Sequence, residues 1–415
     1  MDLALGFDFG TSGARAVVID GSGVIQHQGC TGYDLLSAGS WQMALRELMA
    51  KIPLSLRPRI ASIAVDGTSG TGLLVNNWGV PVTAPLPYYH RCPVNLQLVP
   101  YHSPARSSTS SLAKLMYWQA TFTEGGEFYF LHQADWLASL LHGQLGISDY
   151  HNALKLGYDV VHLQYPPWFP PVKFRLPQVV APGTPIGTLL PQWCENYHLP
   201  KQCVICAGTT DSNAVTIACL AHTPPAGLGI TILGSTMVLK VLTPNPIFHG
   251  DYGIYSHRWH DPHLNLYVAG GASNTGGAVL KHFFTDQELA DVSLSIDPHQ
   301  ASPYDYYPLL QVGERFPICD PHLPARLTPR PPEPHLFLHG LLESMARIEK
   351  VGYGRLEECG AVYPTQVITA GGGAVNTTWQ TIRGRVLGVP VSRADQADSA
   401  YGTALLAQGT DKLGK

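Results

Sequence analysis

An aspartate followed by a turn of small residues stands near the start of the chain, where residues 8–15 read Asp-Phe-Gly-Thr-Ser-Gly-Ala-Arg. Apolar runs flank this segment, so the turn is expected to join two strands. The backbone N–H groups of such a turn, with the hydroxyls of Thr11 and Ser12, can bind an anion such as a phosphate. Asp8, at the end of the first strand, is the kind of ligand that holds Mg²⁺ through water beside phosphate oxygens. The competing interpretation is an ordinary hairpin turn.

A second carboxylate, Asp211, lies in residues 207–214, which read Ala-Gly-Thr-Thr-Asp-Ser-Asn-Ala. An apolar run precedes it, so it is expected after a strand and at the start of a helix. Phosphoryl transfer needs an oriented acceptor hydroxyl, a base for its proton and stabilisation of charge, and one aspartate is sufficient as the base. Aspartate is also a favoured helix N-cap, which is the purely structural alternative.

Three more glycine-rich segments have the composition of ligand-binding turns. Residues 234–236 (Gly-Ser-Thr) are a second candidate phosphate turn. Residues 371–374 (Gly-Gly-Gly-Ala), followed by Asn376, would let a flat base or ribose lie against bare backbone. Residues 270–277 (Gly-Gly-Ala-Ser-Asn-Thr-Gly-Gly) are expected to form a turn that enters a helix. Each segment taken alone is equally well explained as a tight turn.

The elements that must position these residues alternate between strands and helices, which is an α/β pattern. In the first half, strands are expected at residues 3–9, 14–19, 24–30 and 60–65, with a helix at 41–52 that Ser40 caps. In the second half, strands are expected at 204–207 and 367–369, a hairpin at 227–241, and helices at 338–348, 379–387 and 397–407. The hairpin at 227–241 is similar to the one at the N-terminus, which hints at a duplicated fold. Proline-rich stretches at 163–185 and 321–334 are expected to be irregular.

The size and composition of the chain exclude several classes of protein. Its 415 residues suit two domains, and 45% hydrophobic with 13% charged residues allows sizeable cores. The net charge is −4 with no Lys/Arg block, so neither nucleic acid nor an anionic membrane is expected as a partner. The N-terminus lacks the pattern of a signal peptide, and no apolar run could span a bilayer, so we expect a soluble cytoplasmic protein. Cys203 and Cys206, in the one CxxC of the sequence, are interpreted as buried thiols.

Taken in order, the five motifs resemble those of the FGGY carbohydrate kinase family, which includes glycerol, gluconate, xylulose and ribulose kinases. Residues 8–12 are similar to its first phosphate motif, residues 208–214 to the segment with the catalytic base, and residues 234–236 to its second phosphate motif. Residues 274–276 also have a counterpart, and residues 371–374 are similar to its adenosine motif. The resemblance extends through Trp379, Val389, Pro390 and residues 401–404. The compact chain most resembles the short ribulose/xylulose kinase-like members of cyanobacteria and plants.

This resemblance implies an α/β fold of two actin-like, ribonuclease H-like lobes with ATP, Mg²⁺ and the sugar in a central cleft. It implies an N-terminal lobe at residues 1–222, with residues 393–415 packing back on it, and a nucleotide-binding C-terminal lobe at residues 223–392. The expected partners are ATP and a small-molecule sugar, without nucleic acid or membrane. The chain is expected to be a monomer or a small homo-oligomer.

The resemblance also assigns roles to individual residues. Asp211 is expected to accept the proton of a terminal sugar hydroxyl, and Asp8 to position Mg²⁺ and contact the sugar. The expected sugar contacts are Asp8, Ser12, Gly13, Ser69 and Asp211. The expected nucleotide contacts are Thr11, Ser12, Gly13, Gly234, Ser235, Thr236, Gly276, Gly372, Gly373, Ala374 and Asn376.

Two segments depart from the family pattern and bear on the choice of sugar. Residues 87–91 read Pro-Tyr-Tyr-His-Arg where many members have an Asp-x-Arg element whose aspartate contacts the sugar. Residues 66–70 read Asp-Gly-Thr-Ser-Gly where xylulose kinases have Gly-Gln-x-His-Gly. Small hydroxyl side chains replace Gln and His, so we expect the sugar to be held loosely, with a high KM. D-Ribulose is the first choice of substrate and D-xylulose the second.

Two functions of another class share the expected fold. An actin-like or Hsp70-like ATPase would hydrolyse ATP without a sugar, and a sugar-binding regulator would release no ADP at all. Fold alone does not separate these from a kinase. Sugar-stimulated release of ADP does.

Overall fold

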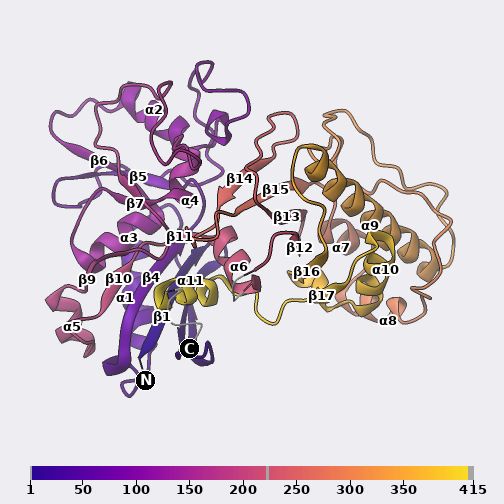
Figure 1. Ribbon diagram of the computed structural model, residues 1–415, viewed down its shortest axis with the longest axis horizontal. Coiled ribbons are helices and arrows are strands. Elements are labelled where there is room, and N and C mark those ends of the chain that lie inside the picture. Colours follow the sequence, from indigo (N-terminus) through magenta and orange to yellow (C-terminus); the bar gives the residue numbers. More distant parts are fainter. Residues whose placement is uncertain (1, 221–223, 410–415) are drawn as a thin grey trace. The chain divides into compact units, whose positions relative to one another are not determined.

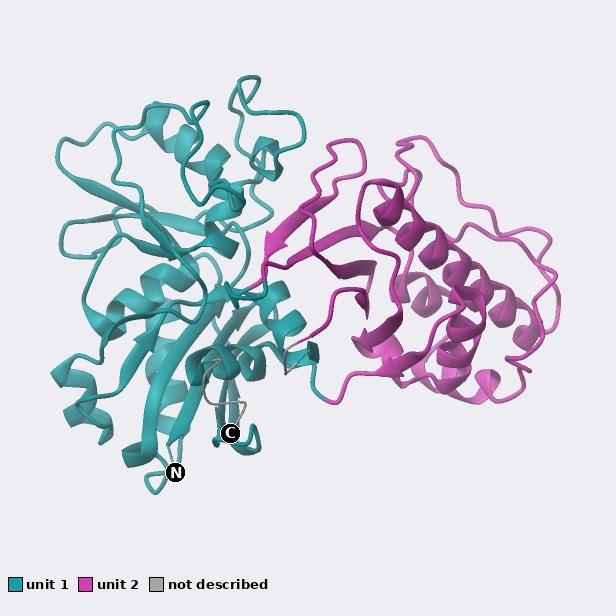
Figure 2. Ribbon diagram, viewed as in Figure 1, with its two compact units in different colours: residues 1–223, 260–264, 396–415 teal, residues 224–259, 265–395 magenta. Residues whose placement is uncertain are grey.

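The computed structural model describes residues 2–220 and 224–409 and divides into two compact units (Figures 1 and 2). Unit 1 consists of Met1–Thr223, His260–Leu264 and Gln396–Lys415, and unit 2 of Pro224–Trp259 and Asn265–Asp395. Unit 1 therefore collects segments from both ends of the sequence. No helix within the described residues is long and apolar enough to cross a membrane.

The main sheet of unit 1 combines an antiparallel meander with parallel strands, in the order β3-β2-β1-β4-β10-β9 with β11 beside β4. Its strands are β1 (Leu3–Gly10), β2 (Gly13–Ile19), β3 (Ile25–Thr31), β4 (Ile60–Gly67), β9 (Pro185–Thr188), β10 (Val204–Cys206) and β11 (Thr209–Thr210). Strands β1 to β3 are antiparallel neighbours, whereas β4 is parallel to β1, and β10 and β11 are parallel to β4. The carboxyl ends of β1, β4 and β11 therefore meet at one edge of the sheet.

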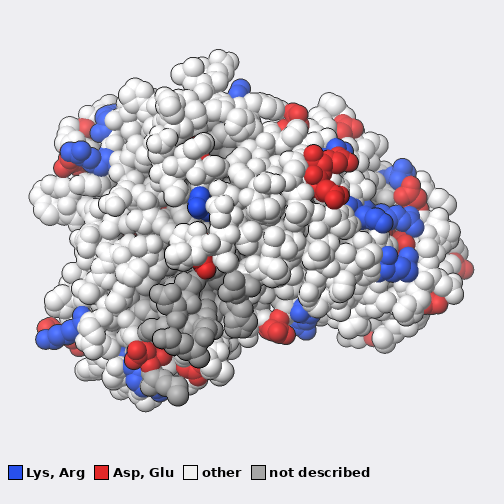
Figure 3. Space-filling view, in the orientation of Figure 1, with Lys and Arg blue, Asp and Glu red and all other residues white. Residues whose placement is uncertain are grey.

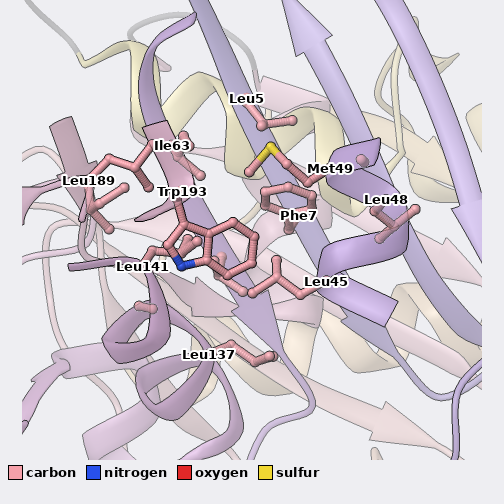
Figure 4. Close-up of a cluster of buried hydrophobic side chains, with 14 of the residues drawn as sticks. Leu5, Phe7, Leu45, Leu48, Met49, Ile63, Leu137, Leu141, Leu189 and Trp193 are labelled. Carbon is pink, nitrogen blue, oxygen red and sulfur yellow. The ribbon is translucent and has the colours of Figure 1, made fainter. Parts of the chain in front are cut away.

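Alternation along β1 divides its side chains between two layers of helices. Leu5 and Phe7 enter a buried core formed with α1 (Ala38–Lys51) and α3 (Gln133–His142), in which Figure 4 shows them beside Leu45, Met49 and Leu141. The alternate residues of β1, Ala4, Gly6 and Asp8, lie on the opposite face of the sheet, against α11 (Ser399–Gln408). A Cβ atom on Gly6 would come 2.1 Å from the carbonyl oxygen of Ala400, so the close approach of α11 requires glycine there.

The helix expected at residues 41–52 begins earlier than its apolar pattern. Ser37, rather than the predicted Ser40, is the N-cap of α1, and its Oγ accepts a hydrogen bond from Ser40 N at 3.2 Å. Ser40 Oγ instead accepts from Asp34 N at 2.9 Å, which fixes the loop before the helix. The prediction was wrong because the first turn carries only Ala38 toward the core, which is too weak an apolar signal.

A second layer of unit 1 follows β4 and contains a separate small core. Its elements are β5 (Gly72–Asn76), α2 (Ser111–Thr121), β6 (Phe128–His132), β7 (Ile147–Asp149), α4 (Tyr150–Ala153) and β8 (Gln178–Val180). Leu74, Trp118 and Phe130 are buried in its core. The unit is completed by α5 (Pro191–Tyr197) and α6 (Asp211–Leu220). Apart from β8, the proline-rich stretch before β9 has no regular strand or helix.

The sheet of unit 2 has the order β14-β15-β13-β12-β16-β17. Its strands are β12 (Leu228–Leu233), β13 (Met237–Thr243), β14 (Tyr255–Arg258), β15 (Tyr267–Ser273), β16 (Gln366–Ala370) and β17 (Val391–Arg393). Its helices are α7 (Gly277–Phe283), α8 (Asp286–Ser293), α9 (Pro334–Glu358) and α10 (Thr377–Leu387). As in unit 1, an antiparallel hairpin is followed by a strand parallel to its first member. The topology thus repeats, with β12, β13 and β16 corresponding to β1, β2 and β4.

The glycine-rich segment at residues 270–277 is only partly a turn. Gly270 and Gly271 lie inside β15, where a Cβ on Gly271 would meet the ring of Phe316 at 2.6 Å. The turn itself is confined to residues 274–276, and α7 begins at Gly277. These first two glycines therefore serve packing, and the prediction that they belong to the turn was wrong.

Neither the cysteine pair of the CxxC sequence nor the charges on the face shown in Figure 3 indicate a further site. Cys203 and Cys206 are buried free thiols, and burial raises their pKa values to about 12 and about 11, so neither is reactive near neutral pH. On the face shown in Figure 3, Lys and Arg side chains lie interspersed with Asp and Glu. No basic patch gathers on that face.

Candidate active site

Two buried carboxyl groups face each other on neighbouring strands of unit 1. Asp8 on β1 and Asp66 on β4 are partners in the parallel register, and alternation points both toward α11. The side chains are 1% and 0% exposed. Asp8 Oδ2 accepts a hydrogen bond from Arg15 Nη1 at 3.2 Å, and Asp66 Oδ2 accepts one from the hydroxyl of Thr403 on α11.

Ser399 on α11 also hydrogen-bonds the Asp8 carboxyl group, whereas Asp66 Oδ1 has no donor among the described residues unless a proton lies between the two carboxyl groups. Burial, together with the charge of Asp8, holds the pKa of Asp66 well above its usual range, and burial also raises the pKa of Asp8. One shared proton satisfies this oxygen and leaves the pair with a single negative charge. Asp66 then donates to Asp8 and accepts from Thr403.

The turn between β1 and β2 leaves its backbone open to solvent. Thr11 and Ser12 are exposed, and Ser12 Oγ accepts from Arg15 Nη2 at 3.4 Å. Gly13 has φ of 140°, and a Cβ there would lie 3.0 Å from the carbonyl oxygen of Thr31. The turn therefore needs glycine at this position and presents small residues, which is the arrangement expected for a phosphate.

Asp211 lies beside this pair at the same edge of the sheet. It follows β11, whose Thr209 and Thr210 pair with Asp66 and Gly67 of β4, and it is the first residue of α6. Its Oδ1 accepts from Ser212 N at 2.7 Å, and the side chain is half-buried. The carboxylate thus lies at a helix N-terminus with its side chain partly exposed, so the structural and catalytic interpretations are compatible.

Buried side chains hold β11, the strand that directly precedes Asp211. His151 Nδ1 lies 2.7 Å from Thr209 Oγ1, and Asn152 Nδ2 donates to Thr209 O at 3.1 Å. Asn152 is in turn fixed by Asp149, whose Oδ2 accepts from its amide at 2.7 Å. Burial raises the pKa of Asp149 to about 7. These three residues of β7 and α4 keep β11 in register with β4.

Ser69 is the one hydroxyl of the turn after β4 that is left for a ligand. Thr68 and Thr71 are buried, and their Oγ1 atoms lie 2.5 Å apart. Ser69 is half-buried and makes no hydrogen bond within the described part of the chain. The structure therefore brings Asp8, Asp211 and Ser69 to the ends of neighbouring strands in unit 1.

Lys155 is a further residue at this turn, and the sequence analysis missed it. Its Cδ atom lies 3.7 Å from the position that a Cβ on Gly70 would take. The side chain is half-buried, and no described carboxylate lies within ion-pair distance of it. Lys155 stands 56 residues before Asp211 in sequence, in an unremarkable Leu-Lys-Leu, so no sequence pattern marks it.

The segment at residues 87–91, which lacks the family's aspartate, lies against the same turn. Tyr88 N donates to Thr71 Oγ1 at 3.0 Å, and Cys92 N donates to Ser108 O at 2.8 Å. His90 is half-buried and Arg91 is exposed. The segment thus belongs to the wall beside Ser69 and contributes no carboxylate to it.

In unit 2 the predicted nucleotide segments meet at the end of β12. Gly277 N donates to Gly234 O at 2.8 Å, and a Cβ on Gly276 would lie 2.8 Å from Ser235 O. Gly371, with φ of 84°, packs on Leu233, because a Cβ there would lie 2.6 Å from the carbonyl oxygen of Leu233. Gly372 is exposed, with open space where its Cβ would be. Bare backbone from three segments therefore forms one surface.

Asn376 and Glu314 hold the segments of this surface in place through hydrogen bonds. Asn376 Oδ1 accepts from Trp379 N at 2.9 Å and its Nδ2 donates to Ser293 Oγ at 2.8 Å, so both ends of the amide are already used. Glu314 is buried and accepts from Asn274 N at 2.8 Å and Ser273 Oγ at 2.6 Å. Asn376 acts as the N-cap of α10, and the sequence analysis did not identify Glu314.

Known proteins with similar sequences include carbohydrate kinases. The C-terminal domain model of the FGGY family of carbohydrate kinases matches residues 230–408. Autoinducer-2 kinase from Yersinia pestis is 23% identical, over 94% of this chain and 82% of that protein. The chain is thus similar to members of the FGGY family of carbohydrate kinases.

Solved structures share the fold of this chain over nearly its whole length. Glycerol kinase from Plasmodium falciparum with ADP superposes with a TM-score of 0.84 at 15% identity, covering 100% of this chain and 90% of that chain. Xylulose kinase from Rhodospirillum rubrum gives 0.82 at 18% identity, covering 99% and 92%. The expectation of two actin-like, ribonuclease H-like lobes is therefore confirmed.

Proposed function

We propose that this protein is an ATP-dependent carbohydrate kinase of the FGGY family that phosphorylates D-ribulose to D-ribulose 5-phosphate, with Asp211 as the general base. The observation that carries the proposal is the position of Asp211, half-buried at a helix N-terminus beside the strand ends of Asp8 and Asp66. Catalysis of phosphoryl transfer consists mainly of positioning and charge stabilisation, for which this arrangement is suited. ATP supplies the phosphoryl group, and Mg²⁺ offsets the charge of its phosphates.

Each predicted residue has a place in this mechanism. Asp211 accepts the proton of the terminal hydroxyl as its oxygen attacks the γ-phosphorus. The backbone at residues 11–13 and 234–236 binds the β- and γ-phosphates. The backbone of Gly372, Gly373 and Ala374 lies against the adenosine, with Asn376 and Gly276 shaping that surface.

The residues present fit Mg²⁺ held through water by Asp8. No three His, Cys, Asp or Glu side chains among residues 2–220 and 224–409 are placed to hold a metal ion. Mg²⁺ usually keeps several waters and uses one or two carboxylates plus phosphate oxygens, so no such cluster is required. A carboxylate has about four acceptor sites, and Asp8 uses three of them, on Arg15, Asp66 and Ser399. Asp8 therefore retains one acceptor site for metal-bound water.

The turn after β4 offers contacts that suit a ketose, whereas the preference for D-ribulose over D-xylulose rests on the family resemblance. Ser69 has a free hydroxyl where xylulose kinases have a histidine, and Lys155 lies beside it. Ser69 donates to a sugar hydroxyl, and the ammonium of Lys155 donates to the carbonyl end of the open-chain ketose. Residues 87–91 contain no carboxylate, so the sugar makes few charged contacts and its KM is high.

Steady-state kinetics with D-ribulose and D-xylulose, with the product analysed by phosphorus NMR, test this proposal. We expect a higher kcat/KM for D-ribulose and a phosphate on its C5 oxygen. A higher kcat/KM for D-xylulose would replace D-ribulose by the second choice. Failure of both ketoses while another sugar is phosphorylated would contradict the proposed substrate.

A further inference from the structure

Five hydrogen bonds, two of them buried and three partly buried, connect the segment at residues 87–91 with the turn at residues 11–13. Tyr88 N donates to Thr71 Oγ1 at 3.0 Å, and Thr71 Oγ1 lies 2.5 Å from Thr68 Oγ1. Thr68 Oγ1 donates to Gln133 Oε1 at 2.9 Å. Gln133 Nε2 donates to the hydroxyl of Tyr33 at 3.2 Å, and Tyr33 donates to Gly10 O at 2.7 Å.

The direction of this chain is fixed by its two ends. It begins at a backbone N–H, which can only donate, and it ends at a carbonyl oxygen, which can only accept. Each hydroxyl between them must therefore accept from one neighbour and donate to the next. Thr68 N also donates to Gln133 Oε1 at 3.0 Å, which fixes the orientation of the amide. Hydrogen bonds in such a chain polarise and strengthen one another.

The chain has little freedom to rearrange. Thr68, Thr71 and Gln133 are buried, and burial raises the pKa of Tyr33, so its hydroxyl keeps the proton that it donates to Gly10. The ring of Tyr33 packs edge-on against Phe9, with centroids 5.4 Å apart. A Cβ on Gly67 would lie 3.0 Å from Gln133 Oε1, so the amide also fills the space beside β4.

We propose that Gln133 is a positioning residue that couples the sugar side of unit 1 to its phosphate turn. The coupling rests on the proposed function, because the segment at residues 87–91 and Ser69 are the proposed sugar side. A sugar that orders Tyr88 orders Thr71 and Thr68, and through Gln133 and Tyr33 it fixes the carbonyl that precedes Thr11. The position of the phosphate turn is then coupled to the sugar side through these hydrogen bonds.

Variants that break one link each test the coupling. Tyr33→Phe, Gln133→Met and Thr71→Val each remove one member with little change in volume. We expect each to raise the KM for ATP about three- to tenfold and to lower the ratio of sugar-stimulated to sugar-independent ADP release by a similar factor. Thr71→Ser keeps the hydroxyl and is expected to behave as wild type. The double variant Tyr33→Phe with Gln133→Met is expected to be no worse than the more impaired single variant.

The control is Tyr165→Phe, which removes a hydroxyl that donates to a backbone carbonyl, Pro177 O at 3.2 Å, elsewhere in unit 1. It matches Tyr33→Phe in chemistry and is expected to leave both readouts unchanged. Additive effects in the double variant, a Thr71→Ser as impaired as Thr71→Val, or unchanged readouts in all variants would overturn the coupling. If no sugar stimulates wild type, the proposed function fails, and direct titration of ATP still tests the chain, because Tyr33→Phe must weaken nucleotide binding.

Discussion

At the scale of single residues, the pair of carboxyl groups on Asp8 and Asp66 determines the charge at the ends of β1 and β4. The two carboxyl groups come from strands more than fifty residues apart, and a residue on α11 donates to one of them. Because both are buried, they cannot carry two full charges at low cost. A shared proton resolves this, and it makes Asp66 a donor to Asp8.

Substitution of Asp66 separates hydrogen bonding from charge. Asp66→Asn keeps a donor for Asp8 and an acceptor for Thr403, so we expect kcat within a few-fold of wild type. Asp66→Ala removes a partner of Asp8, and a buried group left unsatisfied costs about 1–3 kcal/mol, whereas Thr403 still donates to Ser399 O at 3.0 Å. We expect a lower melting temperature and at least tenfold lower kcat for Asp66→Ala, measured on the same preparations. Equal kcat in the two variants would contradict the shared proton.

Lys114 on α2 gives a pH dependence of stability. It is buried, and its Nζ donates to Thr109 O at 2.6 Å. Burial is the main cause that lowers the pKa of Lys114 from 10.5 to about 8. Cys92 opposes this shift, and the nearby charge of Lys155 contributes to it. The unfolded chain therefore binds this proton more tightly than the folded one. The buried charge of Lys114 lowers the free energy of unfolding below about pH 8. This destabilisation decreases as the pH rises from about 8 toward 10.5.

Comparison of wild type with Lys114→Met isolates this effect. The variant cannot titrate, so the melting temperature of wild type is expected to rise relative to the variant between about pH 8 and about pH 10. Melting is followed by circular dichroism at a series of pH values. Two curves that remain parallel over this range would contradict the lowered pKa.

At the scale of elements, glycines let α11 approach both β1 and α6. A Cβ on Gly402 would lie 1.9 Å from the carbonyl oxygen of Ala214 in α6. Gly402→Ala is therefore expected to destabilise unit 1 by about 1–3 kcal/mol, as overpacked cores do. Gly354, inside α9, has nothing within 4 Å of the corresponding position. Gly354→Ala is the matched control and should stabilise by about 0.4–1 kcal/mol.

Thermal melting of the two alanine variants checks this contrast. The expected melting temperatures lie on opposite sides of the wild-type value. A Gly402→Ala variant as stable as wild type would mean that α11 can move away from α6, contrary to the close packing that holds Thr403 against Asp66.

The same elements show what the sequence could predict. Strand ends and small-residue turns were visible because apolar runs stop at Asp8, at Asp66 and before Asp211, and the strands agree with these limits to within two residues. Contacts between distant residues were not visible, since nothing local pairs Tyr33 with Gln133 or Asp66 with Thr403. Lys155 and Glu314 were missed for the same reason. Gly270 and Gly271 were misassigned because a packing glycine and a turn glycine look alike in sequence.

At the scale of the whole molecule, the chain repeats one topology in its two units. The first hairpin of each carries a small-residue turn, residues 11–13 and residues 234–236, and each is followed by a strand parallel to the hairpin's first member. Unit 2 stabilises its copy with a buried ion pair, in which Arg383 Nε donates to Glu349 Oε2 at 2.6 Å and Arg383 Nη1 to Thr369 Oγ1 at 2.6 Å. The duplicated fold suggested by the two hairpins is thus present.

The measurement that tests the central claim most directly is release of ADP from Mg²⁺-ATP by wild type and Asp211→Asn, with D-ribulose, L-ribulose, D-xylulose, glycerol or no sugar. We predict that D-ribulose stimulates wild type most strongly. Asp211→Asn should bind ATP normally and lose the stimulated rate by about 10²–10⁴-fold, the usual contribution of a general base. Equal release of ADP with every addition would identify a sugar-independent ATPase, and full stimulated activity in Asp211→Asn would contradict its role as the base.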